Sequence, residues 1–489
     1  MRRTVFLFMV LVFAASVWAA EKYEANWESL DKRPAPEWFR DAKFGIFIHW
    51  GVYSAPAWGP KGTYSEWYWR RSHKSATELG NNEWAKFHKE TYGEDFSYFD
   101  FAPKFTCEMF DPDQWADFFA RGGAKYVVLT SKHHDGFCLW PSKEANKTWG
   151  RKWNSVDAGP GRDLLGELTT SVRKRGIKMG FYYSLYEWFN PLWLSDRKRY
   201  VEEHMIPQFK DVITRYEPSL IFSDGEWDMK DKDWHSEEIV AWIYNEAKCR
   251  DDVIVNDRWG KGARHNHGGY YTTEYGAGMK DAAHPWEECR GMGHSFGYNR
   301  NETVNEYKGA RELLLMLIDL VSRGGNLLLD IGPTGDGRIP VIMQERLVQM
   351  GEWLKVNGEG IYGTRTWKKT CQWSDGLRPG QIYKEYRAKY NIADVVGSGP
   401  KDGKAVKEIF FTSKPGVLYA IVAAWPGDEL VVRDVEPAAD VKVSMLGRNE
   451  PLSWRREGER IVIDLSGIGR NDLPCKWAWT FRIEGNIGR

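Results

Sequence analysis

The feature that most constrains the fold is a set of apolar segments that each stop at polar residues. The apolar run over residues 220–223 has the pattern of a buried parallel strand, and Asp224, Gly225 and Glu226 follow it directly. Earlier apolar runs begin at residues 44, 126 and 179, and they end at polar residues in the same way. In a (β/α)8 barrel, the carboxyl ends of the strands form the face that carries the chemistry. The sequence therefore predicts an α/β fold with a (β/α)8-like barrel and a site at its mouth.

The alternation of strand and helix patterns extends to about residue 362. Helices are expected over 164–175, 195–215, 236–248, 310–323 and 340–356, and further strands over 253–259, 270–275 and 326–331. This order implies parallel pairing through right-handed crossovers. The segments 285–289 and 295–300 are irregular and aromatic, with no strand pattern. The catalytic barrel is expected to occupy residues 21–362.

A different pattern begins after the last of these helices. Short alternating segments at 409–411, 417–422, 430–433, 441–445 and 460–464 are separated by turns, with no helical segment between them. They predict a C-terminal all-β sandwich domain over residues 363–489. No chemistry-bearing residues cluster there, so its expected role is to stabilise the barrel, with carbohydrate binding as the less favoured alternative.

The first 20 residues have the pattern of a secretory signal peptide. Arg2 and Arg3 precede an apolar stretch from Val5 to Ala15, and small residues follow it. The stretch is shorter than the roughly 18 apolar residues of a membrane span, and no later segment supplies them. The mature protein is therefore expected to be exported, either secreted or periplasmic, and not held in a membrane.

The charge balance and the aromatic content indicate the class of partner. Lys plus Arg and Asp plus Glu number 68 each, so nothing favours nucleic acid or an anionic membrane surface. A neutral partner is expected. The 26 tryptophans are many for the length, and aromatic rings suit the flat apolar faces of sugars, although core packing accounts for most of them.

Metal binding has little support in the sequence. The six cysteines contain no C-x-x-C pair, although one or two disulfides of undetermined connectivity are compatible with export. His133 and His134 are adjacent, but no Glu-x-x-His motif or third ligand accompanies them. We interpret the pair as hydrogen-bonding groups for sugar hydroxyls, and expect no metal and no other cofactor. If the strand continues through the pair, only one of the two side chains faces the barrel axis.

Glu66 lies among four aromatic residues, in the stretch from residue 64 to residue 69. A carboxylate in apolar surroundings is costly unless it is hydrogen-bonded, which favours a place in the site. Pairing with Arg70 or Arg71 on a helix surface is an equally good interpretation of the spacing.

Carboxylates at the mouth of a barrel with a neutral partner suit glycoside hydrolysis, in which one carboxylate attacks the anomeric carbon and another acts as acid and then base. Asp224 is the better nucleophile because it directly follows a buried strand, while Glu226 and Asp228 compete with it. The acid/base candidates are Glu274, Glu287 and Glu288, and spacing alone does not separate them. Any one glutamate taken singly is more often a surface or salt-bridged group.

Several motifs occur together between about residues 38 and 367. They are His49-Trp50-Gly51, Glu66-Trp67, Lys132-His133-His134-Asp135-Gly136-Phe137, Tyr182-Tyr183-Ser184, Ser223-Asp224-Gly225, Trp286-Glu287-x-Cys289 and the run from Gly325 to Pro333. In combination they resemble the α-L-fucosidases of glycoside hydrolase family 29. The resemblance implies a retaining, exo-acting hydrolase that removes terminal α-L-fucosyl residues from oligosaccharides or glycoconjugates by double displacement.

The resemblance also assigns roles to individual residues. It implies Asp224 as the nucleophile and favours Glu274 over Glu287 as the acid/base, although the acid/base position varies within the family. The residues that it places around the fucose are His49, Glu66, Trp67, His133, His134, Tyr183, Arg258 and Phe296. Phe296 stands where many members have tryptophan, so the pocket wall is expected to differ in detail.

Two other functions remain open at the level of sequence. A different retaining glycosidase, such as a galactosidase on a similar barrel, would keep both carboxylates. A sugar-binding protein without turnover would keep the aromatic residues and histidines but would need neither carboxylate. The linkage preference, the aglycone and the oligomeric state are not determined by the sequence.

Overall fold

The computed structural model describes residues 22–75, 78–280, 283–380 and 391–486. The predicted signal peptide at 1–20 lies outside the described residues. Among the described residues, no helix combines the length and the apolar character that crossing a membrane requires. All six cysteines are unpaired.

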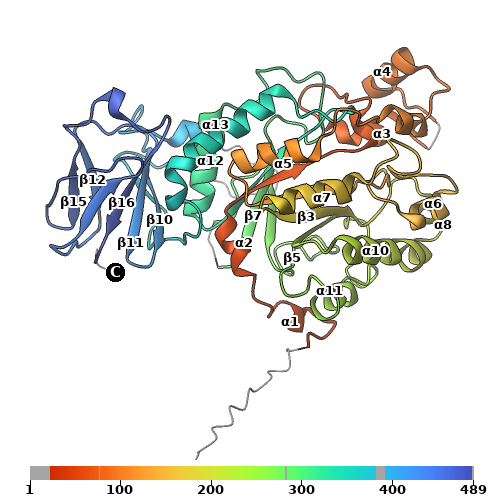
Figure 1. Cartoon of the computed structure of the whole chain (residues 1–489), viewed down its shortest axis with the longest axis horizontal. Helices are drawn as coiled ribbons and strands as arrows, with labels where there is room; N and C mark the ends of the chain where they lie inside the picture. Colours follow the sequence, from red (N-terminus) through yellow and green to blue (C-terminus); the bar gives the residue numbers. More distant parts are fainter. Residues whose placement is uncertain (1–21, 76–77, 281–282, 381–390, 487–489) are drawn as a thin grey trace, which may run out of the picture.

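Eight parallel strands curl into the barrel in the order β5-β4-β3-β2-β1-β8-β7-β6 (Figure 1). Their bounds are β1 Phe44–Ile48, β2 Tyr126–Lys132, β3 Lys178–Ser184, β4 Leu220–Asp224, β5 Ile254–Val255, β6 Tyr271–Glu274, β7 Trp286–Gly291 and β8 Asn326–Ile331. The short strands β5 and β6 are the two ends of this order. The (β/α)8-like fold predicted from the sequence is confirmed.

Strand β7 corrects one expectation, because its first residues belong to the segment that we expected to be irregular. It pairs in parallel with β6 on one side and with β8 on the other. Its polar residues have partners inside the fold: Glu288, for example, accepts hydrogen bonds from Thr273 and from the backbone N–H of Gly276. Because its polar residues interrupt any apolar run, the hydrophobic pattern of the sequence could not reveal β7.

Helices cover the outside of the sheet (Figure 1). The longer ones are α4 Glu83–Tyr92, α5 Pro112–Arg121, α7 Leu164–Lys174, α10 Ile206–Tyr216, α11 Ser236–Asn245, α12 Ala310–Ser322 and α13 Val341–Asn357, and the shorter ones are α1 Trp27–Leu30, α2 Glu37–Ala42, α3 Tyr68–Ser72, α6 Lys143–Trp149, α8 Pro191–Ser195 and α9 Arg197–Tyr200. Side-chain caps define several starts: Asp111 accepts from two backbone N–H groups of α5, and Asp163 from one of α7.

The helix expected over 195–215 runs from residue 197 to residue 216, with a π-helical turn at Val201–Met205 between α9 and α10, and extended backbone at Asp196 separates it from α8. Pro207 stands near the start of α10 and has no N–H to donate, so a regular ladder of α-helical hydrogen bonds cannot pass through it.

Aromatic and apolar side chains fill the barrel interior beneath the mouth. Phe47, Tyr182, Phe222, Phe296 and Leu328 pack in one buried cluster. Each of these residues except Phe296 comes from a strand, so the cluster forms a rigid floor for the site above it.

The C-terminal part forms two antiparallel sheets, which lie beside α12 and α13 (Figure 1). The sheets are β13-β16-β11-β10-β9 and β12-β15-β14, with bounds β9 Cys371–Trp373, β10 Lys407–Lys414, β11 Val417–Val422, β12 Glu429–Arg433, β13 Lys442–Met445, β14 Trp454–Arg456, β15 Arg460–Asp464 and β16 Trp479–Glu484. Residues of both sheets share one apolar core. Trp353 on α13 donates to Ala478 O at 2.8 Å, and Lys407 on β10 pairs with Asp319 on α12 at 2.5 Å, so polar contacts bind the sheets to the barrel helices.

Candidate active site

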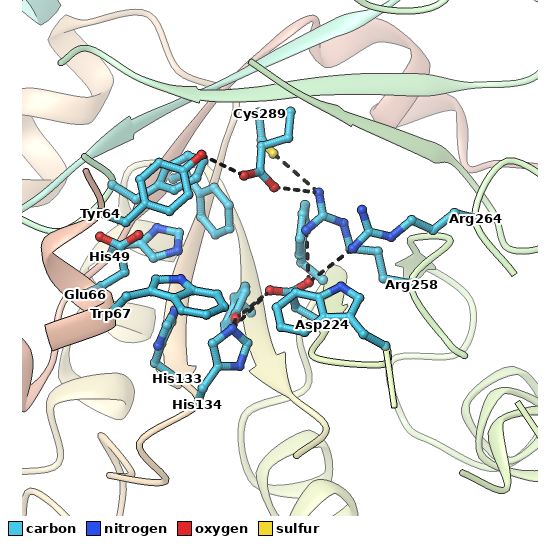
Figure 2. Close-up of a pocket in the computed structure, with 16 residues that line it drawn as sticks. His49, Tyr64, Glu66, Trp67, His133, His134, Asp224, Arg258, Arg264 and Cys289 are labelled. Atoms are coloured by element: carbon cyan, nitrogen blue, oxygen red, sulfur yellow. Dashed lines mark hydrogen bonds and ion pairs between the residues drawn. The ribbon is translucent and has the colours of Figure 1, made fainter. Parts of the chain in front are cut away.

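A cavity of about 300 Å³ opens at the carboxyl ends of the barrel strands (Figure 2). Its size is at the lower end of the range of small-molecule sites, and it fits one sugar ring better than a long chain. The residues that line it are Phe47, His49, Tyr64, Glu66, Trp67, His133, His134, Tyr182, Phe222, Asp224, Trp227, Arg258, Arg264, Glu274, Cys289 and Phe296.

Asp224 is the last residue of β4, and its carboxylate faces the cavity. Tyr182 donates its hydroxyl to Oδ2 at 2.8 Å, and Arg258 donates to Oδ1 at 3.0 Å. Burial raises the pKa of Asp224, but Arg258, His134 and Arg264 outweigh it and lower the pKa to about 2. The carboxylate is therefore charged at neutral pH, as a nucleophile must be.

Glu274 ends β6 and faces the same cavity. Its Oε1 accepts from the hydroxyl of Tyr64 at 3.0 Å, and its Oε2 accepts from Nη2 of Arg258 at 3.2 Å. Nη1 of Arg258 binds Asp224, so one guanidinium contacts both carboxylates. The planar geometry of the guanidinium constrains how the two carboxylates lie relative to each other.

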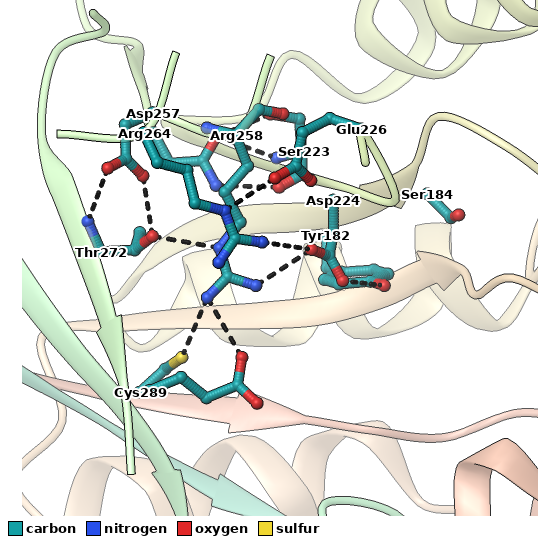
Figure 3. Close-up of polar contacts among 12 residues, drawn as sticks. Tyr182, Ser184, Ser223, Asp224, Glu226, Asp257, Arg258, Arg264, Thr272 and Cys289 are labelled. Atoms are coloured by element: carbon teal, nitrogen blue, oxygen red, sulfur yellow. Dashed lines mark hydrogen bonds and ion pairs between the residues drawn. The ribbon is translucent and has the colours of Figure 1, made fainter. Parts of the chain in front are cut away.

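Arg258 is held in place by its own neighbours. Its Nε donates to Thr272 Oγ1 at 3.0 Å, and the hydroxyl of Thr272 donates to Asp257 at 2.7 Å (Figure 3). Both supports are buried and lie behind the guanidinium, so the arginine is prepositioned before any ligand binds.

Glu66 is buried on the opposite side of the cavity from Arg258 (Figure 2). Its Oε2 accepts from the Gly297 backbone N–H at 2.9 Å and from Ser295 Oγ at 3.2 Å, rather than pairing with Arg70 or Arg71. Burial is the main effect that raises the pKa of Glu66, to about 8. At neutral pH the carboxyl is therefore protonated and can donate a hydrogen bond to a ligand.

Three histidines, His49, His133 and His134, line the cavity, and burial lowers the pKa of all three. The pKa is about 3 for His49 and about 4 for His134, so both rings are neutral at pH 7. Both rings of the adjacent pair line the cavity, and the condition under which only one would face the barrel axis is not met. Strand β2 ends at Lys132, and the strict alternation of a strand no longer applies beyond it. In the parts of the chain that the structure describes, no group of three or more His, Cys, Asp or Glu residues is placed to hold a metal ion.

Two sequence profiles match the chain. One, described as Alpha-L-fucosidase, matches residues 10–359, and the other, described as Alpha-L-fucosidase C-terminal domain, matches residues 402–484. The chain belongs to the α-L-fucosidase family.

Curated relatives in this family match over nearly their whole length. The chain is 40% identical to the tissue alpha-L-fucosidase of Rattus norvegicus over 97% of this chain and 96% of the relative. It is 39% identical to the tissue alpha-L-fucosidase of Homo sapiens over 98% of this chain and 97% of the relative. Among solved structures, the Thermotoga maritima alpha-fucosidase in complex with fucose is 34% identical, with a TM-score of 0.74 over 94% of this chain and all 100% of that chain.

Most of the residues that the family resemblance pointed to line the cavity. They are His49, Glu66, Trp67, His133, His134, Asp224, Arg258, Glu274 and Phe296. Phe296 stacks on the His49 ring with centroids 4.7 Å apart, which gives the wall an apolar face next to polar nitrogens.

Tyr183 does not line the cavity of this α-L-fucosidase family member. Its hydroxyl donates to Gln208 Oε1 at 2.8 Å, on the helix side of β3, and its ring packs against Phe209. Tyr182 lies on the barrel side instead. The alternation of side chains along a strand could have identified Tyr182. In the ladder of β3 and β4, Tyr182 is paired with Phe222 and Ser184 with Asp224, so Tyr182 is on the same face of the sheet as the pair that contains Asp224.

Glu287 and Glu288 also lie away from the cavity. Glu287 is opposite Thr272 in the β6–β7 ladder, one inward-facing position deeper than Glu274, and it accepts a hydrogen bond from Tyr126 at 2.5 Å. Burial chiefly raises its pKa, to about 8, so the carboxyl is a neutral core group at pH 7. Glu288 points to the outer side of β7, towards Thr273 and the Gly276 backbone.

The other acidic residues that competed for the nucleophile are occupied elsewhere. Glu226 Oε1 accepts from Arg264 Nε at 2.7 Å and does not line the cavity, and Asp228 pairs with Arg197 at the surface. Seven lining residues were not anticipated as site residues. Four of them, Phe47, Tyr182, Phe222 and Cys289, lie on barrel strands, and the other three are Tyr64, Trp227 and Arg264. These last three come from loops beyond strand ends, where the sequence carries no periodic signal.

Proposed function

We propose that this member of the α-L-fucosidase family is an exo-acting retaining hydrolase that removes terminal α-L-fucosyl residues, with Asp224 as nucleophile and Glu274 as acid/base. The observation that supports it most is that these two carboxylates face one cavity and are contacted by the two terminal nitrogens of Arg258. Glu287 is not proposed as the acid, because it lies deeper in the barrel and is bonded to Tyr126.

In the first step, an Oδ atom of Asp224 forms a bond to the anomeric carbon while the glycosidic C–O bond breaks. The leaving oxygen takes the proton of Glu274. In the second step, Glu274 removes a proton from water, the water oxygen bonds to the anomeric carbon, and the ester bond to Asp224 breaks. Two displacements at the same carbon give a product of retained configuration.

Arg258 can serve both steps. Before the reaction it stabilises the charge of Asp224. Once Asp224 is an ester it carries no charge, and Glu274 is then the one of the two carboxyl groups that remains an ionic partner of the guanidinium. Tyr64 donates a hydrogen bond to the same carboxylate.

The walls of the cavity suit a 6-deoxy sugar. Phe47, Phe222 and Phe296 present apolar surface, and neutral histidines with Glu66 supply polar groups for ring hydroxyls. The proposed substrates are fucosylated oligosaccharides or glycoconjugates. The predicted signal peptide supports export as the place of action, and the same proposal assigns catalysis to residues 21–362 and support to residues 363–489.

A galactosidase or a binding protein without turnover would give a different result with nitrophenyl glycosides. We expect the α-L-fucoside to be hydrolysed. For the α-L-galactoside, which only adds a hydroxyl, kcat/KM should be lower by about 10²-fold, and the β-D-galactoside should not be hydrolysed. An NMR time course should show the retained anomer of fucose first. Preference for the β-D-galactoside, lack of turnover, or initial formation of the other anomer would each contradict the proposal.

A further inference from the structure

The ring of His49 has one nitrogen fixed inside the barrel. Its Nδ1 lies 2.6 Å from Oδ1 of Asp330, and both side chains are buried. Asp330 belongs to β8, beside β1, with Phe47 as its partner in the ladder. Since Nδ1 is occupied, Nε2 is the nitrogen through which His49 can serve a ligand in the cavity.

This contact is compatible with two proton arrangements. An ionised Asp330 would accept from Nδ1–H and leave Nε2 as a hydrogen-bond acceptor. A protonated Asp330 would donate to Nδ1, and the hydrogen of the neutral ring would then lie on Nε2. The two arrangements make His49 complementary to different atoms of a sugar.

We propose that Asp330 is a positioning residue that carries a proton, donates it in a hydrogen bond to Nδ1, and thereby makes Nε2–H of His49 a hydrogen-bond donor to the sugar. This proposal rests on the proposed function in one respect only, which is the identity of the sugar that His49 would bind. It adds a residue that touches no substrate and acts through His49.

The first support is the poor solvation of the Asp330 carboxyl. Its Oδ2 is buried and has no hydrogen-bond partner within the described residues. A buried carboxylate with a single side-chain contact would be a poorly compensated charge, whereas a neutral carboxyl needs far fewer hydrogen bonds.

Glu187 shows what this fold provides for a carboxylate that is charged. It is as buried as Asp330, yet it is bonded by Lys132 Nζ at 2.8 Å, His204 Nε2 at 2.8 Å and Asn190 Nδ2 at 2.7 Å. Burial raises the pKa of Glu187, but His204 and Lys132 outweigh it and lower the pKa to about 2. Asp330 has no comparable set of donors among the described residues.

The second support is the charge of the groups that face Asp330. They are Glu66, Tyr53 and Tyr275, and none of them is a cation. Burial, and then Glu66, raise the pKa of Asp330 well above its usual range, against a smaller opposing effect of the His49 backbone N–H. Burial likewise lowers the pKa of His49 to about 3, so proton transfer to the ring is unfavourable.

The direct test is the tautomer of His49 in the resting enzyme. Two-bond ¹H–¹⁵N spectra of the full chain with ¹⁵N-histidine resolve ring protonation, and the signal that disappears in His49→Gln identifies this ring among the 11 histidines. We expect protonated Nε2 and unprotonated Nδ1 at pH 7. A proton on Nδ1 would overturn the proposal. Because the measurement needs no turnover, its result is independent of whether the proposed fucosidase activity is found.

Two variants provide the kinetic test. Asp330→Asn keeps an N–H donor to Nδ1, so we expect the same tautomer and kcat/KM within about 3-fold of the wild type. Asp330→Leu has similar bulk and no donor, so we expect a mixture of tautomers and a fall in kcat/KM on the order of 10- to 100-fold. Full activity in Asp330→Leu, or an equal loss in Asp330→Asn, would contradict a positioning role. If Asp330→Leu does not fold, the wild-type spectrum and Asp330→Asn decide the question.

Discussion

Nη1 of Arg258 lies 3.0 Å from Oδ1 of Asp224, and this contact stabilises a buried carboxylate in its charged form at the mouth of the barrel. The contact joins two neighbouring strands of the sheet, because Asp224 ends β4 and Arg258 follows β5. The proposed reactivity of the site therefore depends on a pair that neither strand supplies alone.

Asp224→Gly should lower kcat by about 10²-fold or more without unfolding the protein, because it removes the atom that forms the covalent intermediate. Added azide should partly restore turnover by occupying the vacated space, and the fucosyl azide should have inverted configuration. Asp228→Gly is the matched control, since Asp228 pairs with Arg197 at the surface. More than about a tenth of the wild-type kcat in Asp224→Gly would exclude it as the nucleophile.

Glu274→Ala should affect natural fucosides far more than nitrophenyl fucosides, because a sugar leaving group needs a proton and a nitrophenolate hardly does. External azide should increase its rate and give a fucosyl azide of retained configuration. Glu287→Ala should affect both substrates in proportion and show no azide rescue. Selective loss and rescue at Glu287 instead would transfer the acid/base role to it.

Tyr182→Phe and Tyr183→Phe form a matched pair on adjacent residues. The first removes the hydroxyl that donates to Asp224, and kcat/KM should fall by about 10-fold, the value of one buried hydrogen bond to a charged group. The second removes the bond to Gln208 and should lower Tm while leaving kcat/KM nearly unchanged. Steady-state kinetics and thermal unfolding of both variants measure this difference. The opposite pattern would place Tyr183 in the site after all.

The pH dependence of activity should include the ionisation of Glu66. Its pKa is raised to about 8, so the neutral donor form is present below that pH and is lost as the pH rises through it. Glu66→Gln keeps a donor that does not titrate, and the alkaline limb of its kcat/KM profile should move to higher pH. An unchanged limb would mean that Glu66 does not titrate in this range or does not bind the sugar.

Removal of metal should leave activity intact. The proposed reaction uses carboxylates for attack and proton transfer, and no step requires a Lewis acid. Dialysis against EDTA followed by assay of the nitrophenyl fucoside is the measurement. Loss of activity with recovery on addition of Zn²⁺ or Ca²⁺ would show that a metal is needed.

The sequence was sufficient for the features that depend on local pattern. An apolar run that stops at Asp224 predicts both the strand and the position of the carboxylate at its end, because the two follow from consecutive residues. The same holds for Glu274 at the end of β6 and for the change to short antiparallel strands near the C-terminus. The combination of motifs then indicated the family, which the profile matches confirm.

Tertiary structure decided which neighbouring residue faces the site. Tyr182 and Tyr183 are chemically identical and adjacent, and only the register of β3 against β4 directs Tyr182 to the cavity. Glu274 and Glu287 differ in depth because of the register of β6 against β7, a strand whose polar sequence conceals it. The sequence by itself determined where the apolar strands such as β4 lie and which residue types follow them. How deep a residue lies in the barrel, and which face of the sheet its side chain is on, were decided by the fold. Both depend on pairing between segments far apart in the chain, and a shift of the register by one residue moves every side chain to the opposite face.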